Sequence, residues 1–315
     1  MASGWSGREA ALVERRFDSV LAAARQNRTS VGLESISELM PHEGPEGPAE
    51  VSEWLAAHPS VGKLVGDRVV AGPLPPQGES RERQERGRRY LAEAERVVAG
   101  PISPVARLVR CVAVTGSAAY GEPSPQDDLD FLVITRPGSV WPFLLFSYLA
   151  ARRHRTAPHP DVPSHWCFNY VLDERAARGE FGAPRGFLFA REALMARPVA
   201  GEAYYRGLIQ SAGWLEEEVP RLYLRWARDG LPPLPSEDPA PIGIRALNAV
   251  LFPIMAAYLT LVTLVRNRRL SRGGSPEKRF RVEARLDRLT YETGRFDDLR
   301  SLYATSNVHA ATEGA

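Results

Sequence analysis

The stretch VAVTGSAAYGEPSPQDDLDFLVIT, residues 112–135, decides the fold of this 315-residue chain. It begins as an apolar strand, turns at small residues around Gly116, and ends in a second apolar run that opens with Asp128 and Asp130. Side chains two residues apart on a strand point to the same face. The two carboxylates are therefore expected side by side, with the leucine between them in the core.

Such a pair of carboxylates predicts a cation site. Two carboxylates held close together repel each other unless a cation lies between them. Mg²⁺ prefers oxygen ligands and usually takes one or two carboxylates together with substrate phosphates. The turn supplies backbone N–H groups and the Ser117 hydroxyl near the place where those phosphates would lie. A Gly-Ser turn or a surface Asp-x-Asp pair is common by itself, but their combination in one strand–turn–strand unit favours a metal–nucleotide site.

The order of Gly116-Ser117, a spacer and Asp128-Leu129-Asp130 resembles the signature of the polymerase-β-like nucleotidyltransferase superfamily. The later segments FNYVLDE, FAREALMARPV and AGWLEEEVP extend the resemblance, from about residue 85 to about residue 225, to a prokaryotic nucleotidyltransferase-like family. The resemblance implies an α+β fold with a mixed sheet of the nucleotidyltransferase type. It also implies transfer of a nucleoside monophosphate from an NTP to an acceptor hydroxyl.

The resemblance assigns roles to the residues of the motif. Gly116 and Ser117 would hold the β- and γ-phosphates of the NTP. Asp128 and Asp130 would act as catalytic metal ligands for Mg²⁺, with Mn²⁺ as a possible substitute. The metal would neutralise charge at the reacting phosphorus and orient the attacking oxygen.

A third carboxylate, which active members of the superfamily commonly carry on a neighbouring strand, is not evident. The strand expected at 166–172 offers Asn169, and an amide cannot act as a base and binds Mg²⁺ less well than a carboxylate. Asp173, at the end of the same strand, and Glu192, on the following helix, are candidate replacements, Glu192 as a catalytic base. Each residue has an ordinary explanation as well. Asn169 could form a hydrogen bond at the sheet edge, Asp173 could start a turn, and Glu192 could be a solvated helix residue.

A basic loop follows an apolar helix expected at 140–151. Arg152 and Arg153 could bind the triphosphate of a nucleotide, although a solvated loop accounts for them equally well. The three histidines near this loop lack the close spacing of a zinc site. The only two cysteines, Cys111 and Cys167, lie in apolar strand-like runs, which indicates buried free thiols.

The N-terminal part predicts a winged-helix-like module, with helices at 8–27, 31–40 and 48–57 and a hairpin at 61–72. Its third helix, PAEVSEWLAA, carries two glutamates and no basic residue. Phosphate contacts dominate the affinity of proteins for DNA, so a protein-interaction or packing module is favoured over a DNA reader. The formal net charge of +2 also argues against a strong field for nucleic acid.

The expected domains are a winged-helix-like module (1–75), a nucleotidyltransferase domain (80–180), a helical C-terminal domain (181–305) and a disordered tail (306–315). In the C-terminal domain, residues 187–199 and 276–303 are expected to form helices. An uncharged run at 246–265 is long enough to span a membrane. Polar residues and a proline dilute it, so a helix that is buried, or that packs on a partner, is favoured.

Three functions compete. The first is a Mg²⁺-dependent nucleotidyltransferase that uses an NTP and an acceptor hydroxyl, preferably of a small molecule rather than of a protein or RNA. The second is a nucleotide-binding sensor or scaffold protein with impaired catalysis, because the third acid is missing. The third, a DNA-binding regulator, is disfavoured by the acidic N-terminal module. The chain lacks a secretory segment at its start, so a cytoplasmic protein without membrane association is expected.

Overall fold

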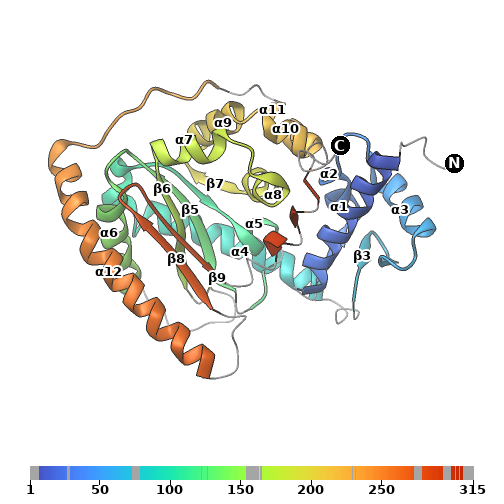
Figure 1. The fold of residues 1–315 in the computed structure, drawn as a ribbon, viewed down its shortest axis with the longest axis horizontal. Coiled ribbons are helices and arrows are strands. Elements are labelled where there is room, and N and C mark those ends of the chain that lie inside the picture. Colours follow the sequence, from blue (N-terminus) through green and yellow to red (C-terminus); the bar gives the residue numbers. More distant parts are fainter. Residues whose placement is uncertain are drawn as a thin grey trace.

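The computed structural model describes most of the chain. The described residues are 7–26, 29–72, 79–121, 123–125, 127–153, 163, 165–228, 230, 232–272, 279–293, 299–301, 303–304 and 306–307. They form a three-stranded sheet, a six-stranded sheet and helices around both, which confirms an α+β architecture (Figure 1).

The six-stranded sheet is mixed. Its strands, in spatial order, are β7 (Arg197–Ala200), β4 (Val109–Val114), β5 (Leu129–Thr135), β6 (Trp166–Asp173), β9 (Arg288–Thr293) and β8 (Phe280–Arg285). Only β5 and β6 pair in parallel, and the other neighbours are antiparallel. Because β4 and β5 are antiparallel, the end of β4 and the start of β5 lie at the same edge of the sheet.

Helices cover both faces of this sheet. One face packs on α4 (Glu79–Ala99), the 3₁₀ helix η1 (Ser103–Leu108), α6 (Val140–Arg153) and α12 (Ile242–Arg272). The other packs on α7 (Glu174–Gly182), α8 (Gly186–Met195), α9 (Glu202–Ser211), α10 (Trp214–Glu218) and α11 (Pro220–Ala227). Alternation along β5 explains this: Phe131 and Val133 enter the first core, whereas Leu132 and Ile134 enter the second.

The N-terminal module lies at the opposite end of the molecule from α12 (Figure 1). Its elements are α1 (Gly7–Gln26), β1 (Ser30–Gly32), α2 (Leu33–Glu38), α3 (Pro48–Ala57), β2 (Lys63–Val65) and β3 (Arg68–Val70). The expected hairpin is therefore present, and β1 completes an antiparallel sheet of order β1-β3-β2. The module shares one hydrophobic core with α7–α11. The fully buried Arg16 of α1 pairs with the fully buried Glu218 of α10, at 2.5 Å.

One helix prediction in the C-terminal part is wrong, and a second helix ends earlier than expected. Instead of one helix at 276–303, the described residues form the hairpin β8–β9, which extends the sheet beyond β6. Val282 and Ala284 pack against the core, and with the partly buried Phe280 they alternate with exposed arginine and glutamate side chains, which is the period of a strand. The helix expected at 187–199 ends at Met195, and the next residues form the edge strand β7. An edge strand accommodates its proline.

The tail predicted to be disordered begins with ordered residues. Ser306 is fully buried; its carbonyl accepts a 2.7 Å hydrogen bond from Arg16 Nε, and its hydroxyl donates to the carbonyl of Arg15 at 3.0 Å. Asn307 Oδ1 accepts the backbone N–H of Phe187 at 2.7 Å. This segment therefore connects the N-terminal module to α8, a long-range contact with no local sequence pattern.

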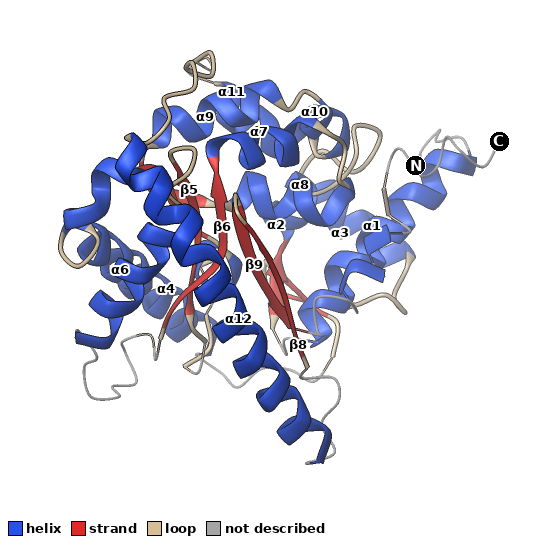
Figure 2. Ribbon diagram, turned by 60° about the vertical axis from the view of Figure 1, so that its left-hand side comes forward, coloured by secondary structure: helices blue, strands red, loops and turns tan. Residues whose placement is uncertain are grey.

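The helix that contains residues 246–265 is not buried, so the first of the two expected alternatives, a buried helix, is wrong. α12 is 31 residues long and packs one side against α6 and β8, while its other side is exposed (Figure 2). Of its side chains only Asn248 and Thr263 are buried. Among the described residues it is the one helix whose length and composition would allow it to cross a membrane.

Candidate functional site

The backbone bend after β4 lies directly against Asp130. The chain turns at Gly116, whose φ of 65° belongs to the left-handed region that glycine adopts without strain, and continues as the short helix α5 (Gly116–Ala119). A Cβ atom on Gly116 would lie 3.1 Å from Asp130 Oδ2. The Thr115 N–H donates to the Asp130 carbonyl at 3.0 Å. The predicted turn and the predicted carboxylate are thus in contact.

The two acids of the motif interact as the alternation predicts. Leu129 is fully buried, Asp130 is partly buried, and Asp128 is exposed at the start of β5. Burial, together with the nearby charges of Asp128 and Asp127, raises the pKa of the Asp130 carboxyl to about 7. This part of the sheet holds negative charges against one another, so a cation would stabilise it.

An irregularity in the sheet directs the next strand's polar groups toward Asp130. Between the pairs Asp130–Cys167 and Leu132–Tyr170, β6 contains one residue more than β5. Such bulges re-aim side chains. Asn169 Nδ2 donates to Asp130 Oδ1 at 2.8 Å, and the Cys167 thiol also forms a hydrogen bond with this carboxylate. The buried Oδ1 of Asn169 has no hydrogen-bond partner within the described part of the chain.

Strand β6 therefore brings an amide and a thiol, and no carboxylate of its described residues, to Asp130. Among the residues that the structure describes, no group of three or more His, Cys, Asp or Glu side chains could hold a metal ion. The two motif carboxylates are the charged groups that the motif itself contributes here.

Glu192, on α8, lies on the site's side of the sheet. Its charge contributes to the raised pKa of Asp130. The Tyr120 hydroxyl, just after α5, donates to Glu192 Oε1, and burial raises the pKa of that phenol well above its usual value. The Arg191 guanidinium lies 4.5 Å from the centroid of the Tyr120 ring and donates to Tyr303 Oη at 2.6 Å. Glu192 is thus positioned by a buried network.

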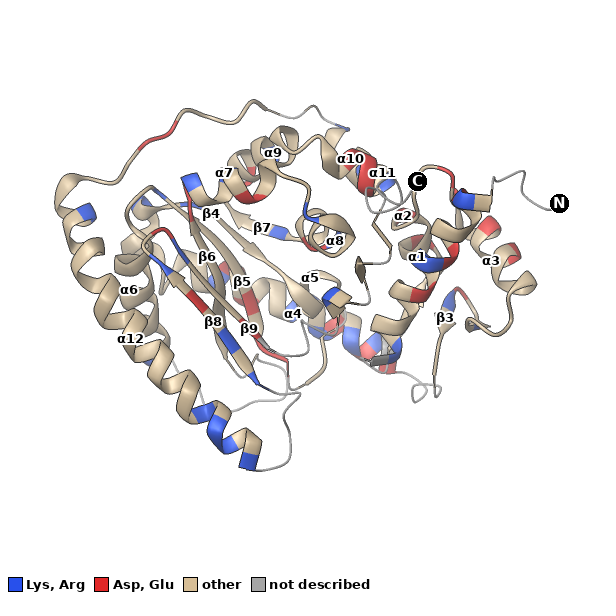
Figure 3. Ribbon diagram, in the orientation of Figure 1, with Lys and Arg blue, Asp and Glu red and all other residues tan. Residues whose placement is uncertain are grey.

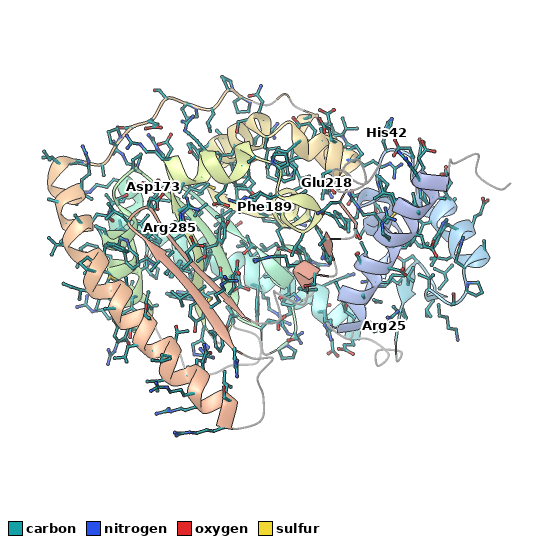
Figure 4. The ribbon with its side chains drawn as sticks, in the orientation of Figure 1. Arg25, His42, Asp173, Phe189, Glu218 and Arg285 are labelled. Atoms are coloured by element: carbon teal, nitrogen blue, oxygen red, sulfur yellow. The ribbon has the colours of Figure 1, made fainter. Side chains whose placement is uncertain are left out.

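Asp173 is not part of the site, which corrects its proposed role as a third carboxylate. Asp173, which is labelled in Figure 4, lies at the other end of β6, opposite Thr135 of β5. Its side chain is the N-cap of α7 and accepts the N–H groups of Arg175 and Ala176, both at 3.0 Å. N-capping of α7, together with a 3.3 Å hydrogen bond from the Gly138 N–H to Oδ2, accounts for this residue.

The arginines expected to hold phosphates lie at the end of α6. Arg152 lies near Tyr258 of α12, where its charge acts on that phenol, and both Arg152 and Arg153 are exposed. Nothing in the described structure brings them against the acids. Most of the loop that follows, with His154 and His159, lies outside the described residues.

Two residues that sequence reasoning did not assign lie at the site. His165 Nδ1 is 3.4 Å from Asp128 Oδ1, and the His165 carbonyl accepts the Leu129 N–H. His165 directly precedes β6, the strand that pairs in parallel with β5, and this position in the sequence could have indicated that it lies near Asp128. The charge of Arg266 acts on Cys167, and its guanidinium lies 3.7 Å from the Phe280 ring centroid. No local pattern indicates that α12 returns to this strand.

Helix α4 fixes the chain between the turn and β5. Arg86 donates to the carbonyl of Pro123 at 2.9 Å, and the Tyr90 hydroxyl donates to that of Asp127 at 3.2 Å. A Cβ atom on Gly87 would lie 2.6 Å from the carbonyl oxygen of Gly121, so only glycine allows this approach. The Arg-rich helix thus positions the motif.

Comparisons of the chain with models of protein families, with curated proteins and with solved structures gave no match.

Proposed function

We propose that this protein is a Mg²⁺-dependent nucleotidyltransferase of the polymerase-β-like type, which moves a nucleoside monophosphate from an NTP to an acceptor hydroxyl. The observation that carries the proposal is the contact between the Gly116 bend and Asp130, with Asp128 beside it. A left-handed backbone turn at Gly116 next to paired carboxylates suits a metal-bound triphosphate.

The residues present fit one divalent cation. Asp128 and Asp130 would supply charged oxygens, and the orphaned Asn169 Oδ1 is a neutral oxygen close to them. Mg²⁺ commonly binds through one or two carboxylates and completes its shell with waters and substrate phosphates. When bound, the cation would neutralise charge that develops on the transferred phosphoryl group.

The protein's own groups would place the reactants. The N–H groups at Gly116 and the Ser117 hydroxyl would bind the β- and γ-phosphates. The acceptor oxygen would attack the α-phosphorus, the bond to the β-phosphate bridging oxygen would break, and pyrophosphate would leave. Glu192 would take the proton of the acceptor hydroxyl once the Tyr120 hydroxyl exchanged to another partner.

Pyrophosphate release tests the proposal. The full chain is incubated with each of the four common NTPs, Mg²⁺ and a panel of hydroxyl acceptors, with small molecules first. We expect release from at least one NTP, dependent on Mg²⁺ or Mn²⁺ and lost in Asp128→Asn and in Asp130→Asn. Full activity in both variants would show that the site is assigned wrongly.

A second candidate function is a nucleotide-binding sensor or scaffold without transfer. Asn169 favours it, because the third strand presents an amide where an active member of the superfamily would present an acid. Tight, Mg²⁺-dependent binding of an NTP without turnover across the acceptor panel would support this alternative. Multiple turnover would exclude it.

The N-terminal module supports either function as a packing or protein-interaction element. Its order of one helix, a strand, two helices and a hairpin is that of a winged helix, but Glu50 and Glu53 on α3 are exposed. An acidic third helix is a poor surface for DNA phosphates. DNA binding is therefore not part of the proposal.

A further inference from the structure

Helix α12 presents an apolar stripe to solvent. The stripe consists of residues three or four positions apart, each between 37% and 62% exposed: Leu247, Val250, Ile254, Tyr258, Leu261 and Val265. Helical spacing puts all of them on one side. An exposed apolar surface of this length on a soluble domain usually marks an interaction site.

The stripe continues onto α6. Phe146, Tyr148 and Leu149 are between 45% and 50% exposed, and the Tyr148 and Tyr258 hydroxyls are hydrogen-bonded to each other. The two helices pack side by side, so their exposed apolar residues form one surface. We call it the α6–α12 face.

The inner side of α12 is tied to the domain near both ends. Near its start, Asn248 Oδ1 accepts the Trp141 N–H at 2.9 Å, and its Nδ2 donates to the Leu286 carbonyl at 3.1 Å. Near its end, Asn267 bonds the N–H and the carbonyl of Phe280 at 2.8 and 2.7 Å. Crossing a bilayer would break these bonds and expose the sheet, so α12 is suited to lie on a surface rather than span it.

The charges on the α6–α12 face have one sign. Neither helix contains an aspartate or glutamate. Arginines gather at the ends of the two helices, with Arg268, Arg269 and Arg272 on α12 and Arg152 and Arg153 on α6. Figure 3 shows α12 in tan along most of its length, with a blue residue near its start, several at its end, and no red. A second copy of the chain would bring these arginines no acidic partner from the same face.

We propose that the α6–α12 face docks on the surface of an anionic phospholipid bilayer. The apolar stripe enters the boundary between headgroups and acyl chains, and the two tyrosines occupy the headgroup level, where their amphipathic rings are stable. The arginines contact the negatively charged headgroups. This docking is independent of the proposed nucleotidyl transfer, because none of these residues belongs to the candidate site.

Sedimentation with vesicles tests the docking. The full chain is mixed with vesicles of equal parts phosphatidylglycerol and phosphatidylcholine, or of phosphatidylcholine alone, at low and high salt. We expect binding to the anionic vesicles that weakens at high salt. Each arginine near such a surface strengthens binding about fivefold, so Arg268→Glu with Arg269→Glu should weaken it at least about 25-fold. Ile254→Asp with Leu261→Asp should weaken it about as much.

The control variant is Leu224→Asp, where the leucine is 55% exposed and lies on α11, which packs on the opposite face of the sheet from α6 and α12. It should bind the vesicles as the wild type does, and circular dichroism should show that all variants are folded. Equal binding by the arginine and stripe variants, or no binding by the wild type, would overturn the proposal. Retention of the wild type in the membrane pellet after alkaline carbonate washing would indicate a span. A dimer in light scattering that Ile254→Asp dissociates, without vesicle binding, would assign the face to a second copy.

Discussion

The two ends of the β5–β6 pair both carry buried acids, but these acids have different neighbours. At one end, Asp173 accepts backbone N–H groups of α7, and the fully buried Glu174 pairs with Arg110 and Arg178. At the other end, Asp130 meets an amide, a thiol and further carboxylates. The first end is completed by donors from its own chain. The second is suited to completion by a positively charged ligand, and this difference supports the proposal that it is the functional end.

The largest effect should come from removing the acids at the functional end. Asp128→Asn or Asp130→Asn should reduce Mg²⁺-dependent pyrophosphate release by about 10³-fold or more, because each removes charge that holds the cation. Asp173→Asn is the matched control, since asparagine also caps helices and the residue lies away from the site. Activity per folded molecule should be unchanged in the control. A loss of equal size there would erase the distinction between the two ends.

The next effect concerns the proposed base. Glu192→Gln keeps the shape of the side chain and an acceptor for the Tyr120 hydroxyl but cannot take a proton. We expect kcat to fall about 10²-fold, with the Kd for the NTP unchanged. Tyr120→Phe is the comparison variant and should retain most activity, since it removes the partner and leaves the base. An unchanged kcat in Glu192→Gln would exclude this role.

Substitutions at the two ends should change the free energy of unfolding in opposite directions. Asp173→Ala should lower the free energy of unfolding by about 1–2 kcal/mol through loss of the helix cap. Asp130→Asn, in metal-free buffer at pH 8, should raise it by up to about 4 kcal/mol, because it removes, beside other acids, the buried charge of a carboxyl whose pKa is raised from 3.8 to about 7. Urea denaturation of both variants provides the test. Destabilisation by Asp130→Asn would show that its charge is already compensated within the fold.

The smallest effect is the same comparison at low pH. The Asp130 carboxyl has a pKa of about 7 in the folded protein against an ordinary value of 3.8. The folded state therefore binds more protons between these values, and stability falls as the pH rises through this range. Asp130→Asn should remove this dependence, so the difference between variant and wild type should shrink toward zero near pH 4. Unfolding curves across the range measure it; a pH-independent difference would contradict the assignment.

The sequence was sufficient for the core of the site. The turn and the paired acids lie in one continuous segment whose spacing is set by strand geometry, and the structure places Gly116 against Asp130 as expected. The N-terminal order of helices and hairpin also followed from local patterns. These features depend on neighbouring residues in the chain, which is the information that periodicity and turn residues contain.

Other features of the fold and the site depend on contacts between residues far apart in the sequence, which local patterns do not predict. The bulge that turns Asn169 toward Asp130 arises from the pairing of two strands. The period of two at Phe280–Arg285 was read as part of a long helix, because charged residues follow in a mixed pattern. Burial of Ser306 requires α1 to pack on it from the far end of the chain. Whether a side of α12 is exposed depends on which other elements pack on it. An apolar sequence alone does not distinguish a buried helix from one with an exposed apolar side.

The central claim is that Asp128 and Asp130 hold a divalent cation together with a nucleotide. Electron paramagnetic resonance of Mn²⁺ in the presence of a non-hydrolysable NTP analogue tests this most directly, because it detects the bound metal whether or not transfer follows. We expect the wild type to bind one Mn²⁺ in a nucleotide-dependent manner, and the doubly substituted Asp128→Asn, Asp130→Asn protein to bind none. Equal Mn²⁺ binding in both proteins, or none in the wild type, would contradict the account.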